Sequence, residues 1–223
     1  MTRIIPMIAA VVAVAIGGYL YMDQDKISST PVNPLIGAAN AQEAGEVDTS
    51  SIVQMEMGSP DAPITIYEYA SYTCPHCATF HQEAFKEIKK NYIDTGKVRF
   101  IYREVYFDRF GLWASLVSRC GGPDKFFGIT DLIYKGQSEW SRAAGPAEIV
   151  DGLRKIGLLA GIEPDVLEAC LQDADKAQTL VAWYQQNAEA DDISSTPSFV
   201  VNGKKVPNQS YADFSAILDD ELN

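Results

Sequence analysis

Hydrophobic and polar positions divide the chain into three stretches. Arg3 precedes an uncharged, mostly apolar run from Ile4 to Met22, which is about as long as a bilayer-spanning helix requires. Residues 23–58 are mainly small and polar with interspersed prolines, a composition that predicts a linker without a core. From residue 59 onward the apolar residues recur with the periods of strands and helices, so the folded body is predicted there.

The first part of the body predicts a strand, a helix and a second strand. β-branched and aromatic residues dominate Ile64–Tyr69 and Val98–Val105, as is typical of strands. Between them, apolar residues at helical spacing follow Cys74 until Gly96 ends the pattern. The economical arrangement is a parallel βαβ unit whose crossover helix begins at Cys74.

The second part predicts helices first and then a hairpin. Residues 108–190 lack convincing strand patterns and contain several helical periods, two of them with Pro near the start. Ser198–Val201, the turn Asn202-Gly203 and Lys204–Val206 then predict a β-hairpin, and a last helix covers Tyr211–Leu222. We therefore expect one α/β domain, formed by residues 59–107 and 191–223, with an all-helical insertion over 108–190.

The N-terminal run bears on where the body resides. Residues 1–22 have the pattern of a signal peptide or a retained membrane anchor, and charge before and after the run favours an exported body. Ala39-Asn40-Ala41 resembles a cleavage site but lies far from the run, so both outcomes stay open. We expect a periplasmic protein, soluble or tethered to the inner membrane, in a compartment where disulfides persist. The net charge of −12 argues against nucleic acid as a partner.

Cys74-Pro75-His76-Cys77 is the motif that carries chemistry. A Cys-x-x-Cys pair at a helix start beside a βαβ pattern is typical of thioredoxin-like redox sites. The free N–H groups and positive dipole of the helix end favour a Cys74 thiolate, and Cys77 is close enough to form a disulfide with it. Pro75 suits the first helical turn, and a charged or donating His76 would stabilise the thiolate and make the disulfide oxidising.

Zinc binding is the competing interpretation of the cysteine pair. Four-coordinate zinc needs two more close ligands. His81 lies one helical turn from Cys77, but Cys120 and Cys170 are distant in sequence. We therefore predict no metal, and no cofactor.

Two segments together resemble the DsbA-like thioredoxin-fold oxidoreductases: Tyr67-Glu68-Tyr69-Ala70-Ser71-Tyr72-Thr73-Cys74-Pro75-His76-Cys77 and Ser195-Thr196-Pro197-Ser198-Phe199-Val200-Val201-Asn202-Gly203-Lys204. The resemblance covers about residues 60–223 and implies a thioredoxin fold with a helical insertion. It implies that Pro197 is cis, and that Thr196 and Pro197, with Pro75, contact substrate. It also implies a buried carboxyl, Glu68, which assists proton transfer at Cys77.

Cys120 and Cys170 are additional to the active-site pair, and a subset of the family resembles this four-cysteine pattern. In an oxidising compartment we expect these two cysteines to form a structural disulfide, which would stabilise the fold by about 4 kcal/mol in the chain-entropy model. A second exchange site is the alternative.

The resemblance implies an enzyme that introduces disulfide bonds into exported proteins and is reoxidised by a membrane quinone-linked partner. Its substrates would be unfolded or reduced exported proteins. Thr196 occurs before the cis-proline of both oxidases and isomerases, so a disulfide isomerase or reductase is one alternative. A peptide-binding chaperone module is another, although it would not need all five of Cys74, His76, Cys77, Glu68 and Pro197 intact.

Overall fold

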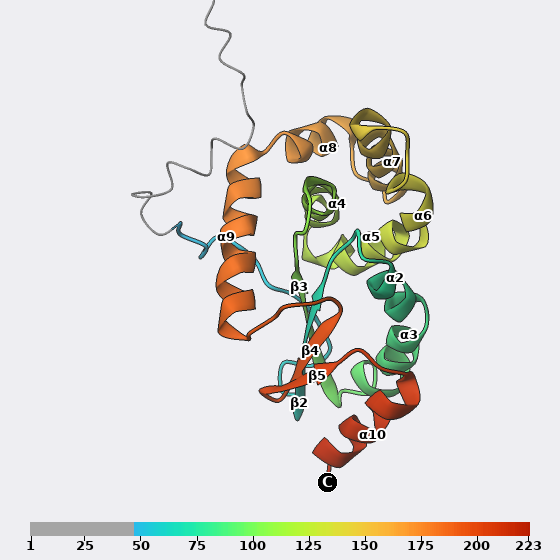
Figure 1. Ribbon diagram of the computed structural model, residues 1–223, viewed down its shortest axis with the longest axis vertical. Helices are drawn as coiled ribbons and strands as arrows, with labels where there is room; N and C mark the ends of the chain where they lie inside the picture. The colour runs from blue at the N-terminus through green and yellow to red at the C-terminus, as the bar shows by residue number, and fades with distance from the viewer. Residues whose placement is uncertain (1–46) are drawn as a thin grey trace, which may run out of the picture. The chain divides into compact units, whose positions relative to one another are not determined.

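A mixed five-stranded sheet organises residues 47–223, the part of the chain that the computed structural model describes (Figure 1). The strands lie in the order β1-β3-β2-β4-β5. Their bounds are Met55–Met57 for β1, Ile64–Ala70 for β2, Val98–Glu104 for β3, Ser198–Val201 for β4 and Lys204–Pro207 for β5. The predicted parallel pairing of β2 with β3 is confirmed, and the other neighbours pair antiparallel. The hairpin turn lies at Asn202 and Gly203, both with positive φ.

The crossover between β2 and β3 is less regular than the single helix that the pattern predicted. It consists of α2 (Pro75–Gln82), α3 (Ala84–Ile88) and the π-helix η3 (Lys89–Ile93). The chain bends at Glu83, whose φ and ψ are −117° and −90°. The Glu83 N–H bonds to the carbonyls of both Thr79 and Phe80, at 3.0 and 3.3 Å, so the bend leaves this donor satisfied.

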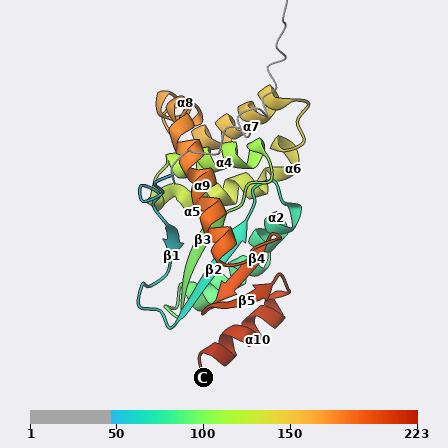
Figure 2. The ribbon, with the colours of Figure 1, turned by 60° about the vertical axis from the view of Figure 1, so that its left-hand side comes forward.

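Alternation along the central strands sends side chains to two different cores. On β2, Ile64, Ile66 and Ala70 join the large core that includes residues of α2 and α3. Tyr67 and Tyr69 point to the opposite face, into a smaller cluster with Tyr184 of α9 (Ala174–Ala190). The two faces are thus covered by different helices, as Figures 1 and 2 show. The last helix, α10 (Tyr211–Glu221), packs beside α3.

A block of helices between β3 and β4 forms the predicted insertion. It contains α4 (Arg109–Cys120), α5 (Pro123–Lys135), α6 (Gln137–Trp140), α7 (Pro146–Leu159), α8 (Pro164–Leu171) and α9. Pro occupies the first turn of α5, α7 and α8, where its missing N–H costs no hydrogen bond. A disulfide joins Cys120 to Cys170, with the two Cα atoms 5.8 Å apart, and so links the end of α4 to α8.

The linker predicted over residues 23–58 is wrong at its C-terminal end. Ile52 and Met55 are buried, and Met55–Met57 form β1, which pairs with β3. A strand of three residues is too short to show a periodic pattern, and its hydrogen-bond partners lie more than forty residues away in the sequence. Residues 1–46, with the predicted signal or anchor and the rest of the linker, lie outside the described residues. Within residues 47–223, no helix combines the length and the apolar character needed to cross a membrane.

Candidate redox site

The loop after β2 places Cys74 at the start of α2. Cys74 is the N-cap residue with extended backbone, and Pro75 occupies the first turn. The helical insertion holds this loop from two sides. The Thr73 hydroxyl donates to Asp108, the N-cap of α4, at 2.8 Å, and the Gln137 side-chain amide donates to the Cys74 carbonyl at 2.9 Å. Cys74 is therefore positioned by contacts that come from distant parts of the chain.

The surroundings of Cys74 favour its thiolate. A hydrogen bond from the Cys77 thiol is the largest effect, and burial partly opposes it. Thr196 and the backbone N–H groups of His76 and Cys77 add further hydrogen bonds, and together these groups lower the pKa of Cys74 from 9.0 to about 5. These N–H groups belong to the first turn of α2, where they have no partner within the helix. At neutral pH the reduced site thus holds Cys74 as an anion.

Cys77 has the opposite character. Its side chain is fully buried, and burial raises the pKa of the Cys77 thiol far above its ordinary value, with the negative charges of Cys74 and Glu68 adding to the effect. Both cysteines are free thiols in this structure. The pair therefore combines one accessible thiolate with one protonated thiol beneath it.

The connection into β4 closes the site on the other side of Cys74. The Thr196–Pro197 peptide bond is cis. The Cys74 thiol donates to the Thr196 carbonyl at 3.4 Å. While Cys74 is protonated, the buried Thr196 hydroxyl oxygen bonds to none of the described residues. Once Cys74 ionises, this hydroxyl can donate to the sulfur, which is how it lowers the pKa of Cys74.

Glu68 lies on the core-facing side of β2 and is fully buried. Its carboxylate bonds to His81 Nε2 at 2.8 Å, and His81 is itself only 4% exposed. The His81 ring stacks on Tyr134, with the ring centroids 4.5 Å apart. Burial raises the pKa of the Tyr134 hydroxyl, and the charges of Cys77 and Glu68 add to the effect. Glu68, His81 and Tyr134 thus form a buried polar group near Cys77, and the Tyr134 hydroxyl also bonds to the Tyr102 hydroxyl at 2.7 Å.

Three comparisons place these features among known proteins. A family model described as Thioredoxin matches residues 50–220. The chain belongs to the thioredoxin family. It is 38% identical over 166 residues to a Rickettsia bellii protein named as a candidate protein-disulfide oxidoreductase, in a match that covers 74% of this chain and 63% of that protein. It is also 28% identical over 173 residues to Disulfide bond formation protein D of Bacillus subtilis, covering 74% of each.

Solved structures identify the form of the thioredoxin fold. The alpha-DsbA1 protein of Wolbachia pipientis aligns with a TM-score of 0.69 and 27% identity, covering 75% of this chain and 89% of that chain. BdbD from Bacillus subtilis, in its oxidised form, aligns with a TM-score of 0.66 and 26% identity, covering 76% and 92%. The fold is therefore the DsbA-like thioredoxin fold with a helical insertion, as the two sequence segments predicted.

Of the two histidines at this thioredoxin-family site, sequence reasoning named His76 as a catalytic residue and missed the pairing of His81 with Glu68. His76 is exposed on α2 and lines a cavity with Thr196 and Pro197; it reaches the Cys74 sulfur through its backbone N–H. His81, considered only as a zinc ligand, instead pairs with Glu68. The signal was present: His81 lies one turn beyond Cys77, and Glu68 falls between the apolar residues of β2. Two polar residues on facing apolar surfaces are expected to pair.

Proposed function

We propose that the protein is a thiol–disulfide oxidoreductase that works as a dithiol oxidase and introduces disulfide bonds into exported proteins. The observation that carries this proposal is the contrast within the pair. The pKa of Cys74 is lowered to about 5, whereas burial raises that of Cys77. A stabilised thiolate favours the reduced form of the pair, so the Cys74–Cys77 disulfide gains oxidising power.

The reaction begins when a substrate thiolate attacks the Cys74 sulfur of the oxidised pair. A mixed disulfide forms between substrate and Cys74, the Cys74–Cys77 bond breaks, and Cys77 leaves as a thiolate. Because Cys77 is fully buried, this anion is costly and takes up a proton at once. Glu68, with His81 behind it, is the acid–base group that lies beneath Cys77 and would carry this proton.

A second substrate thiolate completes the oxidation. It attacks the substrate sulfur of the mixed disulfide, so a substrate disulfide forms and the Cys74 thiolate is released. A thiolate with a low pKa is a good leaving group, which favours this direction of exchange. Two substrate thiols are oxidised to one disulfide, and the enzyme pair is reduced to a thiolate and a thiol.

Substrate would bind across the cis-proline connection. The backbone of Thr196, beside Cys74, would pair with an extended substrate segment, and Pro75 and Pro197 would contact it. The proposal also includes an exported location, periplasmic or otherwise outside the cytoplasm. It further includes a membrane quinone-linked partner that reoxidises the pair. In this proposal the N-terminal segment is either removed or kept as a membrane tether.

An equilibrium redox titration against glutathione tests the direction of the reaction. We expect an oxidising reduction potential for the wild type and a more reducing one for His76→Ala, if the imidazole assists the Cys74 thiolate. A potential of about −270 mV, which is typical of thioredoxin, would instead indicate a reductase or isomerase. An unchanged potential in His76→Ala would show that the imidazole does not stabilise the Cys74 thiolate. The low pKa of Cys74 would then come from Cys77, Thr196 and the backbone N–H groups.

A parallel assay separates an enzyme from a peptide-binding chaperone module. Oxidation of a reduced, unfolded substrate protein should be lost in Cys74→Ser. A chaperone would keep its effect on aggregation of the same substrate in that variant, without forming disulfides.

A further inference from the structure

The loop that carries Cys74 is attached to the helical insertion along its whole length. It comprises residues 71–74, between the end of β2 and the start of α2. Each residue of the loop shares at least one hydrogen bond with a side chain of the insertion, and those side chains belong to Tyr134, Thr130, Gln137 and Asp108. The conformation of the loop therefore depends on the insertion as well as on the sheet.

Gln137, the first residue of α6, makes two of these hydrogen bonds. Its side-chain amide donates to the Tyr72 carbonyl at 2.8 Å and to the Cys74 carbonyl at 2.9 Å. A carboxamide has two N–H groups, so both donors are used on the loop. Gln137 is only 7% exposed, and little water can compete for them. One side chain thus holds the backbone on both sides of Thr73.

The reactivity of Cys74 depends on where its sulfur points. The extended backbone of this N-cap residue, with φ −82° and ψ 118°, places the sulfur beside the N–H groups of His76 and Cys77. A thiol is a weaker hydrogen-bond acceptor than the oxygens usual at a helix N-cap, so it does little to hold this conformation by itself. A hydrogen bond on the Cys74 carbonyl, as Gln137 provides, therefore bears directly on the alignment of the sulfur.

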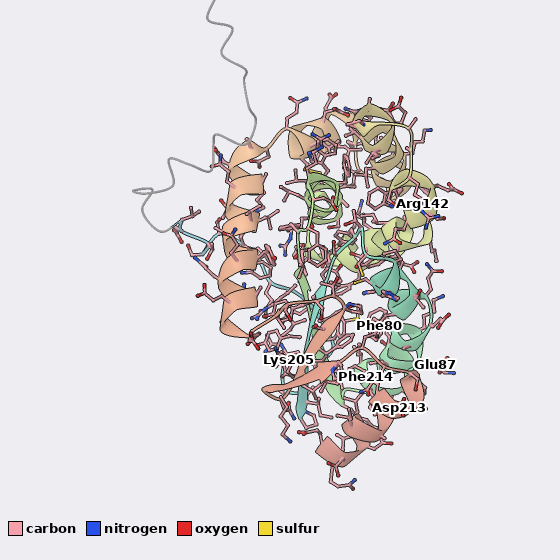
Figure 3. All side chains as sticks on the ribbon, viewed as in Figure 1. Phe80, Glu87, Arg142, Lys205, Asp213 and Phe214 are labelled. Carbon is pink, nitrogen blue, oxygen red and sulfur yellow. A yellow bond between two sulfur atoms is a disulfide. The ribbon has the colours of Figure 1, made fainter. Side chains whose placement is uncertain are left out.

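The position of Gln137 is itself fixed by the short helix α6. Trp140, at the end of this helix, is buried, and its Nε1–H donates to the Ile133 carbonyl of α5 at 2.9 Å. Trp140 also packs against Gly152 of α7, where a Cβ would lie only 2.8 Å from the Trp140 Cβ. Figures 1 and 3 show α6 beside α2, with Arg142 just beyond the end of α6. The amide that reaches the loop is thus held in place by the packing of the insertion.

We propose that Gln137 is a positioning residue, whose amide keeps the Cys74 backbone in the conformation that presents the sulfur to α2 and so makes Cys74 an effective nucleophile and leaving group. The proposal rests on disulfide exchange at Cys74, as in the proposed function, but not on the direction of that exchange. It also gives the insertion a chemical role, because the βαβ unit alone does not contain this contact.

The test compares Gln137→Met with the wild type, both as the reduced full-length protein. Methionine has about the length of glutamine but donates no hydrogen bond. Because the sulfur would be less well aligned with the N–H groups of α2, the pKa of Cys74 should rise by about one unit. Thiolate absorbance measures this pKa, with Cys74→Ser as the blank. At neutral pH the equilibrium with glutathione should shift about tenfold toward the Cys74–Cys77 disulfide.

Thr130→Val is the matched control. Thr130 also belongs to the insertion and bonds to Tyr72, but it contacts the side-chain hydroxyl, at 2.8 Å, and not the loop backbone. This variant should lose stability in urea, as Gln137→Met should, and should keep the pKa of Cys74. Gln137→Asn retains an amide but is one methylene group shorter, so it cannot reach both carbonyls and provides the same test if Gln137→Met does not fold.

An unchanged pKa of Cys74 in Gln137→Met and Gln137→Asn would overturn the proposal. An equal rise in Thr130→Val would also overturn it, because that result would indicate a general loosening of the site. A reduction potential typical of a reductase in the wild type would contradict the oxidase function instead, and would leave the comparison of pKa values intact.

Discussion

Ionisation of Cys74 should make the stability of the reduced protein depend on pH in a way that the oxidised protein does not share. Only the reduced form can hold a Cys74 thiolate, because the sulfur of the oxidised form is bonded to Cys77. Folding lowers the pKa of this thiol from 9.0 to about 5. Since the folded-state pKa is depressed, the resulting stabilisation is complete above about pH 9 and is lost as the pH falls through about 5.

The magnitude follows from this difference. One proton changes the free energy of unfolding by about 1.36 kcal/mol per pH unit, so a gap of four units sets an upper limit of about 5 kcal/mol. Cys74 is only partly buried, and water weakens its interactions, so we expect roughly 2–3 kcal/mol across the window. Cys77 contributes little in this range, because burial raises its folded-state pKa and its unfolded-state thiol stays mostly protonated below its ordinary pKa of 9.0.

Urea denaturation of the oxidised and reduced proteins between about pH 4.5 and pH 8.5 measures the effect. The reduced-minus-oxidised difference in unfolding free energy should rise with pH over that range, and groups that titrate alike in both forms cancel in it. Mass analysis should verify that the Cys120–Cys170 disulfide survives the reduction of the active-site pair. The variant Cys74→Ser/Cys77→Ser should show no change on treatment with reductant. A difference that stays flat between pH 5 and 8.5 would refute the assignment of a low pKa to Cys74.

Three further predictions concern the groups around the pair. Thr196→Val should raise the pKa of Cys74 by roughly one to two units, since a hydrogen bond to a charged group contributes about 1.5–3 kcal/mol, whereas Thr196→Ser should leave it unchanged. Ultraviolet absorbance of the thiolate measures the pKa in each variant, and the same pKa in Thr196→Val and Thr196→Ser would contradict a role for the hydroxyl. Glu68→Leu leaves His81 buried without its partner and should lower the free energy of unfolding by about 3–5 kcal/mol. Glu68→Gln should lose less stability when both variants are unfolded in urea, and equal losses would indicate an effect of packing alone. Replacing both Cys120 and Cys170 by Ser should cost about 4 kcal/mol in the chain-entropy model and leave the pKa of Cys74 unchanged; a shifted pKa would show that the disulfide also shapes the site.

Local pattern was sufficient for the elements whose signals are contained in a short stretch of chain. The alternation in Ile64–Ala70, the turn residues Asn202 and Gly203, and the prolines that begin α7 and α8 each act through neighbours in sequence. The strand β1 carried no such signal, because its stability comes from pairing with β3. The bend at Glu83 was likewise hidden, since the apolar period continues through it.

The features of the redox site likewise fall into those that follow from local sequence and those that depend on distant contacts. The sequence by itself determined that Cys74 caps a helix and that Cys77 lies one turn beyond it, because helix geometry places residues three apart on one face. Only the tertiary structure decided that Thr196 approaches the Cys74 sulfur, that Gln137 holds its carbonyl, and that His81 is the partner of Glu68. These contacts join residues between 13 and 122 positions apart. Burial, which raises the pKa of Cys77, exists only once the distant segments have packed together.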